Sequence, residues 1–210
     1  KEYFKKRVGD VYFARALAFS ELIRIFCEPM TTANANTENM GICLAMTYRD
    51  DVPMVKRSTL LESYNQVLSD LNQAAANIPA ERTVADNPYF SLGAVYALQA
   101  RVYLYMGMGD LSIKKDNEYL KKSVEAAGKV IKTGVYTLSD AVNNVPQAGS
   151  TQYTDYQMMW KYDQSNEIIW KVAMTSVSYG GSLGRYLLGY NTVTYSPQYH
   201  FSEAILSLYD

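Results

Sequence analysis

Few residues in this sequence have side chains suited to catalysis or to binding a metal. His200 is the only imidazole, and Cys27 and Cys43 are the only thiols among 210 residues. A catalytic triad would have to use His200, which has no recognisable catalytic partner and precedes an expected helix. One histidine and two cysteines also cannot supply the Cys₄ or Cys₂His₂ ligands of a structural zinc site. We therefore expect no enzymatic activity, no metal and no cofactor.

Two short motifs that look catalytic or phosphate-binding lack the context which those functions need. Ser112 and Lys115 have the S-x-x-K spacing of a serine–lysine catalytic pair but lie in a polar link between expected helices. The glycines near residue 180 are not followed by the Gly-Lys-Ser/Thr of a phosphate-binding loop. The net charge of −1 excludes the basic surface that nucleic-acid binding usually needs.

Tyrosine is the residue type with a clear chemical use here. The chain has 19 tyrosines, and nine of them lie beyond residue 150 together with both tryptophans. The flat C–H face of a sugar ring packs on an aromatic ring, and tyrosine or tryptophan adds a polar edge at low entropic cost. The alternative for each aromatic residue is that it fills the core beneath a long loop. The candidate ligand-binding residues are Tyr153, Tyr156, Trp160, Tyr179, Arg185, Tyr186, Tyr190 and Asn191.

Amphipathic helices are expected to position these side chains. Apolar residues at three- and four-residue spacing predict helices over residues 3–26, 59–78, 91–106 and 116–132. Thr59 and Glu62 have the spacing of a capping box at the start of the second helix. Asp116 is the expected cap of the fourth helix. In the first helix the expected apolar stripe runs through Phe4, Val8, Tyr12, Phe19, Leu22, Ile23 and Phe26.

The last third of the chain shows little helical periodicity. Apolar residues alternate over residues 168–174, which predicts a short strand with Trp170 on its core face. Earlier, Ala100, Tyr103 and Gly107 have the small-Tyr-Gly spacing of a tetratricopeptide repeat. The sequence therefore predicts a mainly α fold with tetratricopeptide-like helix pairs, long loops and a short strand or strand pair in the last third. The expected division is a helical scaffold over 1–138 and a loop-rich aromatic segment of the same domain over 139–210.

Six stretches, taken in order, resemble the conserved segments of a known family. They are residues 9–26, 41–44, 57–74, 94–107, 130–136 and 165–169. The most detailed are Ala-Arg-Val-Tyr-Leu-Tyr at 100–105 and Ser-Asn-Glu-Ile-Ile at 165–169. In these stretches the chain resembles the SusD/RagB-like outer-membrane nutrient-binding lipoproteins of Bacteroidetes. Because the resemblance covers only the middle of a normally much longer protein, we expect the chain to be a fragment.

The resemblance implies a non-enzymatic lipoprotein exposed on the outer membrane. Such proteins capture oligosaccharides, or peptides in some members, on loops held by the helix pairs. They pass the ligand to a TonB-dependent, SusC-like transporter. Membrane contact is then expected only through an N-terminal lipid anchor that this chain does not include. The alternatives are a peptide-binding member of the same family and a cytosolic helical-repeat scaffold that binds other proteins.

The same resemblance assigns structural roles to several motif residues. Arg15, Tyr103 and Glu167 are expected to have structural roles and to hold helices together rather than to bind ligand. Cys27 and Cys43 stand where the family commonly has glycine and proline. They could close a disulfide worth about 3 kcal/mol or remain as two buried thiols, and the sequence leaves both alternatives open.

Overall fold

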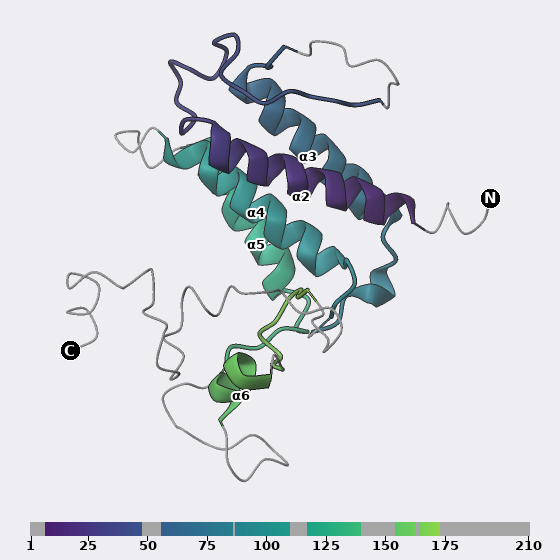
Figure 1. The fold of residues 1–210 in the computed structure, drawn as a ribbon. Coiled ribbons are helices and arrows are strands. Elements are labelled where there is room, and N and C mark those ends of the chain that lie inside the picture. The colour runs from purple at the N-terminus through teal and green to yellow at the C-terminus, as the bar shows by residue number, and fades with distance from the viewer. Residues whose placement is uncertain are drawn as a thin grey trace, which may run out of the picture. The chain divides into compact units, whose positions relative to one another are not determined.

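The computed structural model describes residues 7–47, 56–85, 87–109, 117–139, 154–162 and 164–172. This part is mainly helical, as the sequence predicts (Figure 1). The chain divides into compact units over residues 1–171 and 172–210, and all described helices belong to the first unit. The elements are α2 (Val8–Phe26), α3 (Leu60–Asn77), a short 3₁₀ helix η1 (Ala80–Arg82), α4 (Leu92–Met108), α5 (Glu118–Ile131) and α6 (Asp155–Tyr162).

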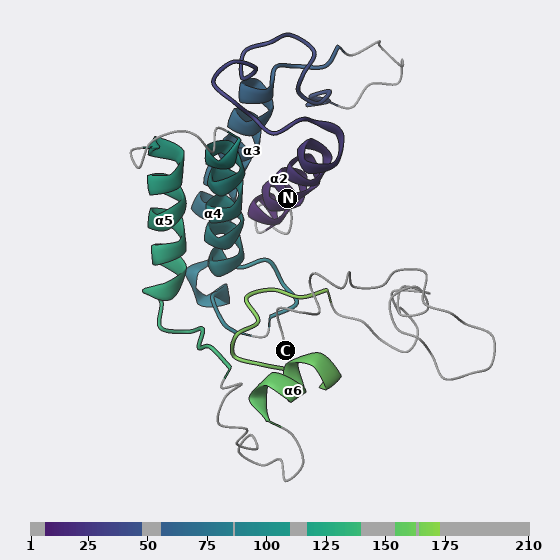
Figure 2. The same cartoon turned by 90° about the vertical axis from the view of Figure 1, so that its left-hand side faces the viewer.

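The first four α-helices form two antiparallel pairs, α2 with α3 and α4 with α5 (Figures 1 and 2). Gly9 at the start of α2 lies against Ile78 just after α3, where a Cβ atom would come within 2.7 Å of Ile78 Cγ1. Gly107 near the end of α4 lies as closely against Leu120 in the first turn of α5. Small residues at these points allow the paired helices to approach, which is the geometry expected of a helical repeat.

Two of the motif residues join helices, as expected. Arg15 of α2 makes a bidentate ion pair with Asp70 of α3, with both N···O distances at 2.7 Å. The ammonium group of Lys122 on α5 lies 5.9 Å from the centre of the Tyr103 ring on α4. The two pairs thus have polar connections in addition to their apolar core.

The buried residues of α2 differ from the apolar stripe that the sequence predicts there. Phe13 and Ile23 are buried on α2, whereas Leu22 and Phe26 of the expected stripe are 39% and 66% exposed. Helix α2 carries apolar residues on more than one face, so their spacing alone did not identify the buried one. The buried apolar residues contributed by α3 and α4 are Leu60, Tyr64, Val67, Leu71, Ala74, Ala94, Val95, Leu98, Val102 and Met106.

Helix ends are fixed by side chains, with one departure from expectation. The capping box is present: Thr59 Oγ1 accepts from the Glu62 amide at 3.1 Å, and a Glu62 carboxylate oxygen accepts from the Thr59 amide at 2.9 Å. Helix α5 is capped by Asn117, which accepts from the amide of Tyr119, rather than by Asp116. Asp116 itself lies outside the described residues.

The last described segments differ most from the sequence-based prediction. Residues 154–162 contain helix α6, where we expected loop, and residues 168–172 run without strand structure. The amide of Lys171 donates to the carbonyl of Asn87, and the amide of Thr137 donates to the carbonyl of Asn166. The segment with alternating apolar residues therefore packs against the helical scaffold. It makes isolated backbone hydrogen bonds instead of the regular hydrogen bonds of a β-sheet. Residues 173–174 of the expected strand lie outside the described part.

None of the described helices has the length and apolar character needed to cross a lipid bilayer.

Candidate functional site

Two of the predicted ligand-binding residues, Tyr156 and Trp160, lie in the described part of the chain, and both are on α6. Tyr156 is 43% exposed. Positions four residues apart share one side of a helix, so the backbone places these two residues on the same side of α6. The remaining candidates lie outside the described residues: Tyr153, Tyr179, Arg185, Tyr186, Tyr190 and Asn191.

Helix α6 begins at a capping box that sequence reasoning overlooked. Thr154 Oγ1 accepts from the amide of Gln157 at 3.2 Å, and the Gln157 side chain accepts from the amide of Thr154 at 3.0 Å. A threonine followed three residues later by glutamine is a recognised helix start. This signal was therefore present in the sequence and could have placed Tyr156 on a helix.

Three aromatic rings attach the segment after α6 to the helical scaffold. The centre of the Phe90 ring lies 4.5 Å from that of Phe13 and 5.5 Å from that of Trp170. The indole N–H of Trp170 donates to the carbonyl of Pro88 at 3.2 Å. Trp170 is partly buried against the core, in agreement with its predicted structural role.

Glu167 fixes the same segment to the chain after α5. Its carboxylate accepts from the amide of Ser139 at 3.0 Å, and the hydroxyls of Ser139 and Ser165 lie 2.9 Å apart. The expectation that Glu167 is structural is therefore confirmed. Together with Trp170, it determines where the chain leaves α6.

An exposed tyrosine lies beside this aromatic cluster. Tyr89 is 64% exposed and borders a shallow pocket of about 230 Å³ with Arg7, Asp10, Pro88 and Phe90. Asp10 accepts hydrogen bonds from Arg7 at 3.0 Å and from Arg82 at 2.5 Å. An exposed ring next to charged side chains could stack on a sugar. Sequence reasoning missed Tyr89 because it lies within the part interpreted as scaffold.

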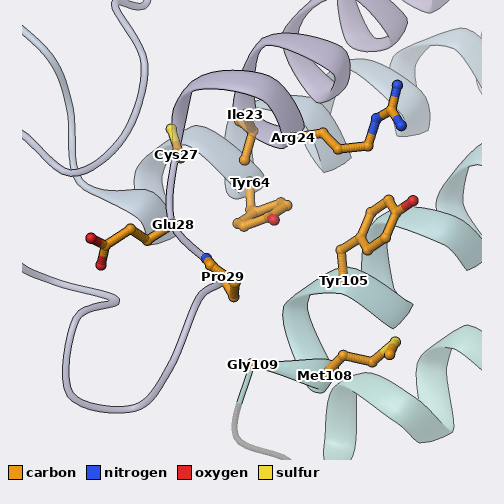
Figure 3. Close-up of a pocket in the computed structure, with 9 residues that line it drawn as sticks. All are labelled: Ile23, Arg24, Cys27, Glu28, Pro29, Tyr64, Tyr105, Met108 and Gly109. Carbon is orange, nitrogen blue, oxygen red and sulfur yellow. The ribbon is translucent and has the colours of Figure 1, made fainter. Parts of the chain in front are cut away.

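A larger pocket lies where α2 ends, between α3 and the end of α4 (Figure 3). Its volume is about 400 Å³. Tyr64 from α3 and Tyr105 from α4 flank it, and the remaining lining comes from Ile23, Arg24, Cys27, Glu28, Pro29, Met108 and Gly109. No local sequence pattern links these two tyrosines, which are far apart in the chain.

Comparison with known proteins identifies the family. Residues 1–104 match the SusD-like family described as "Starch-binding associating with outer membrane". A SusD superfamily protein from Bacteroides thetaiotaomicron has 25% sequence identity and a TM-score of 0.65 over 90% of this chain. The chain belongs to the SusD-like family. It spans 36% of that Bacteroides thetaiotaomicron protein.

A second solved structure has the same fold. A SusD-like protein from Bacteroides fragilis matches 82% of this SusD-like chain with 23% identity and a TM-score of 0.55, and the match covers 28% of that protein. No curated protein matches the chain significantly. The solved structures therefore support the helical-repeat fold, and each corresponds to a considerably longer protein.

The two cysteines of this SusD-like chain are not joined by a disulfide. The Cys27 sulfur accepts a hydrogen bond from Arg57 at 3.6 Å, and Cys43 is exposed. The sequence left open a disulfide or two buried free thiols. Both cysteines are free thiols in the structure, but neither is buried. Among the described residues, no group of three His, Cys, Asp or Glu side chains is placed to hold a metal ion.

Burial of the Tyr64 phenol predicts a specific loss of stability at high pH. Desolvation, followed by the charges of Cys27 and Tyr105, raises the pKa of Tyr64 from 10.0 to about 12. The folded state thus holds this proton more tightly than the unfolded state does. Its stabilising contribution is complete below pH 10 and is lost as the pH rises through about 12, at about 1.4 kcal/mol per pH unit. The free energy of unfolding in urea, measured at several pH values between 10 and 12, should fall less steeply with pH for Tyr64→Phe than for the wild-type protein. An equal pH dependence of the two proteins would contradict the prediction.

Proposed function

We propose that this chain is part of a non-enzymatic, cell-surface protein that binds a glycan and delivers it to a TonB-dependent transporter of the outer membrane. The match of residues 1–104 to a family described as starch-binding and associated with the outer membrane carries this proposal. In this proposal the complete protein is a lipoprotein. Binding is reversible, and no covalent bond is made or broken.

The proposed glycan surface consists of aromatic residues supported by the helical scaffold. Three of the proposed residues are Tyr156 and Trp160 on α6 and Tyr153 just before it in the sequence, and the remaining five lie beyond residue 172. Sugar rings would stack on these faces, while side chains such as those of Arg185 and Asn191 would pair with sugar hydroxyls. Exposed Tyr89, with Arg82 nearby, adds a candidate stacking position on the scaffold itself.

The attachment of residues 165–171 to the scaffold favours such a surface. Preorganised side chains lose less conformational entropy when they bind a ligand than mobile ones do. Trp170 packs on Phe90, and Glu167 accepts from the Ser139 amide, so the segment that follows α6 is held at two points. Binding on α6 would therefore engage a helix whose exit is already fixed.

Affinity electrophoresis of the full chain against a panel of polysaccharides, including starch, tests this function. We expect at least one glycan to retard the wild-type protein. The replacements Tyr156→Ala, Trp160→Ala, Tyr179→Ala and Tyr186→Ala should include variants with about tenfold weaker binding, which corresponds to about 1.4 kcal/mol. Tyr105→Ala is the matched control, because Tyr105 is also a partly exposed helix tyrosine but lies at the end of α4, outside the proposed surface.

Two outcomes would contradict parts of the proposal. If no glycan retards the protein while a peptide library binds it, the chain is a peptide-capture member of the family. If a glycan binds but all four variants retain wild-type affinity, the glycan-binding surface lies elsewhere.

A further inference from the structure

The pocket between Tyr64 and Tyr105 has no role in the proposed glycan surface, yet it has the properties of a binding site for a small molecule. Its volume of about 400 Å³ lies within the range of about 300–1,000 Å³ that is usual for such sites. Three separate elements contribute walls: the end of α2, the N-terminal part of α3 and the end of α4. The contact surface is mainly apolar, with Ile23, Pro29 and Met108 beside the two rings (Figure 3).

One polar group in this pocket has no hydrogen-bond partner among the described residues. Tyr64 is only 6% exposed, and its hydroxyl makes no hydrogen bond to any residue in the described part of the chain. In Figure 3 its ring lies between Pro29 and Tyr105, within the pocket. A ligand that fills the pocket would desolvate this hydroxyl, so a ligand atom that hydrogen-bonds to it is favoured over one that leaves it unpaired. This hydroxyl is a specific recognition point in an otherwise apolar site.

The charged residues at the rim do not favour an ionic ligand. The guanidinium group of Arg24 is hydrogen-bonded to the carboxylate of Glu21, so its charge is already matched. The carboxylate of Glu28 points away from the space between the two tyrosines (Figure 3). Desolvating an ion in an apolar pocket without a matching charge is costly. The pocket therefore suits a neutral ligand.

We propose that this pocket binds a small neutral ring compound with a single hydroxyl group, of the phenol class. Its ring would pack against the rings of Tyr64 and Tyr105, in the offset or edge-to-face arrangements that aromatic pairs prefer. The thioether of Met108 would contact the ring edge, which is a favourable arrangement for sulfur. The ligand hydroxyl would exchange a hydrogen bond with the Tyr64 hydroxyl. This site is separate from the glycan surface and does not depend on it.

Titration of the full chain with p-cresol, followed by NMR of labelled methionine methyl groups and by alkylation of the cysteines, tests the proposal. We expect a saturable shift of the Met108 signal. Iodoacetamide should alkylate Cys27 several-fold more slowly when p-cresol is present, because Cys27 lines the pocket. Cys43 does not line the pocket and is the internal control.

Variants separate recognition of the hydroxyl from apolar contact. Tyr64→Phe keeps the ring and should weaken p-cresol binding about five- to tenfold while leaving toluene binding unchanged. Tyr105→Ala should weaken the binding of both compounds, because it removes one wall. Tyr89→Ala, which changes an exposed tyrosine just before α4, should alter neither affinity.

Three results would overturn the inference. The first is the absence of a saturable Met108 shift at millimolar p-cresol. The second is equal affinity of the wild-type protein for p-cresol and toluene, since the Tyr64 hydroxyl would then contribute nothing. The third is protection of Cys27 by methyl glucoside as strong as that by p-cresol, which would make the pocket a sugar subsite. Retardation by polysaccharides in the presence of saturating p-cresol is a separate measurement, so either proposal can fail alone.

Discussion

Replacing Arg15 with methionine is expected to lower the free energy of unfolding by about 3–5 kcal/mol. Asp70 is 1% exposed, and Arg15 is its only cationic partner among the described residues. Both Asp70 oxygens accept from the guanidinium group at 2.7 Å, and Gln66 donates to one of them at 3.0 Å. Without Arg15 the carboxylate would stay buried with the Gln66 amide as its remaining partner, which cannot compensate a full charge.

Chemical denaturation of the single and double variants measures this effect. Arg15→Met combined with Asp70→Leu should recover much of the lost stability, because no buried charge then remains. Arg24→Met is the control on the same helix: the Arg24–Glu21 pair is exposed, and its loss should destabilise the protein far less than the loss of Arg15. If Arg15→Met destabilises the protein no more than Arg24→Met does, the interpretation of the Asp70 site is wrong.

Local sequence patterns predicted the helical scaffold well where a pattern is compatible with only one local structure. The Thr59–Glu62 spacing gave the start of α3, because both side chains bond within the same helical turn. Gly134 ends the turn after α5 with a φ of +66°, a conformation that glycine adopts without strain. On α2, by contrast, apolar residues occur on several faces, and only the packing of α3 shows that Phe13 rather than Phe26 is buried.

The sites depend on contacts between distant residues, and this limited their prediction from sequence. Tyr64 and Tyr105 were each recognised as helix residues, but only the packing of α3 against α4 places them around one pocket. Tyr89 is a candidate for sugar stacking only because the fold brings Arg82 of η1 next to Asp10, which borders the same pocket as Tyr89. The apolar alternation around Trp170 was read as a strand because periodicity does not distinguish strand pairing from docking onto helices. The predicted residues beyond position 172 remain predictions.

Phe13→Ala is expected to lower the free energy of unfolding by a similar amount, about 3–5 kcal/mol, because it would leave a cavity at a fully packed position. Phe13 is 2% exposed and is buried within the core that α2 shares with α3 and α4. Its ring also lies 4.5 Å from that of Phe90 and 6.2 Å from that of Trp170. Val11→Ala on the same helix is the control, since Val11 is 66% exposed and its replacement should change stability by about 0.5 kcal/mol or less.

Phe13→Leu separates the two roles of this ring. Leucine retains most of the apolar volume in the helical core but cannot make the aromatic contacts with Phe90 and Trp170. We therefore expect a loss of about 1–2 kcal/mol, smaller than for alanine, together with faster hydrogen exchange at the Lys171 amide, which donates to Asn87 beside this cluster. Amide hydrogen exchange within α3 should become faster only by the factor that the loss of global unfolding free energy predicts. If Lys171 exchange changes no more than exchange in α3, the aromatic cluster does not control the attachment of this segment, and the glycan surface must be held in another way.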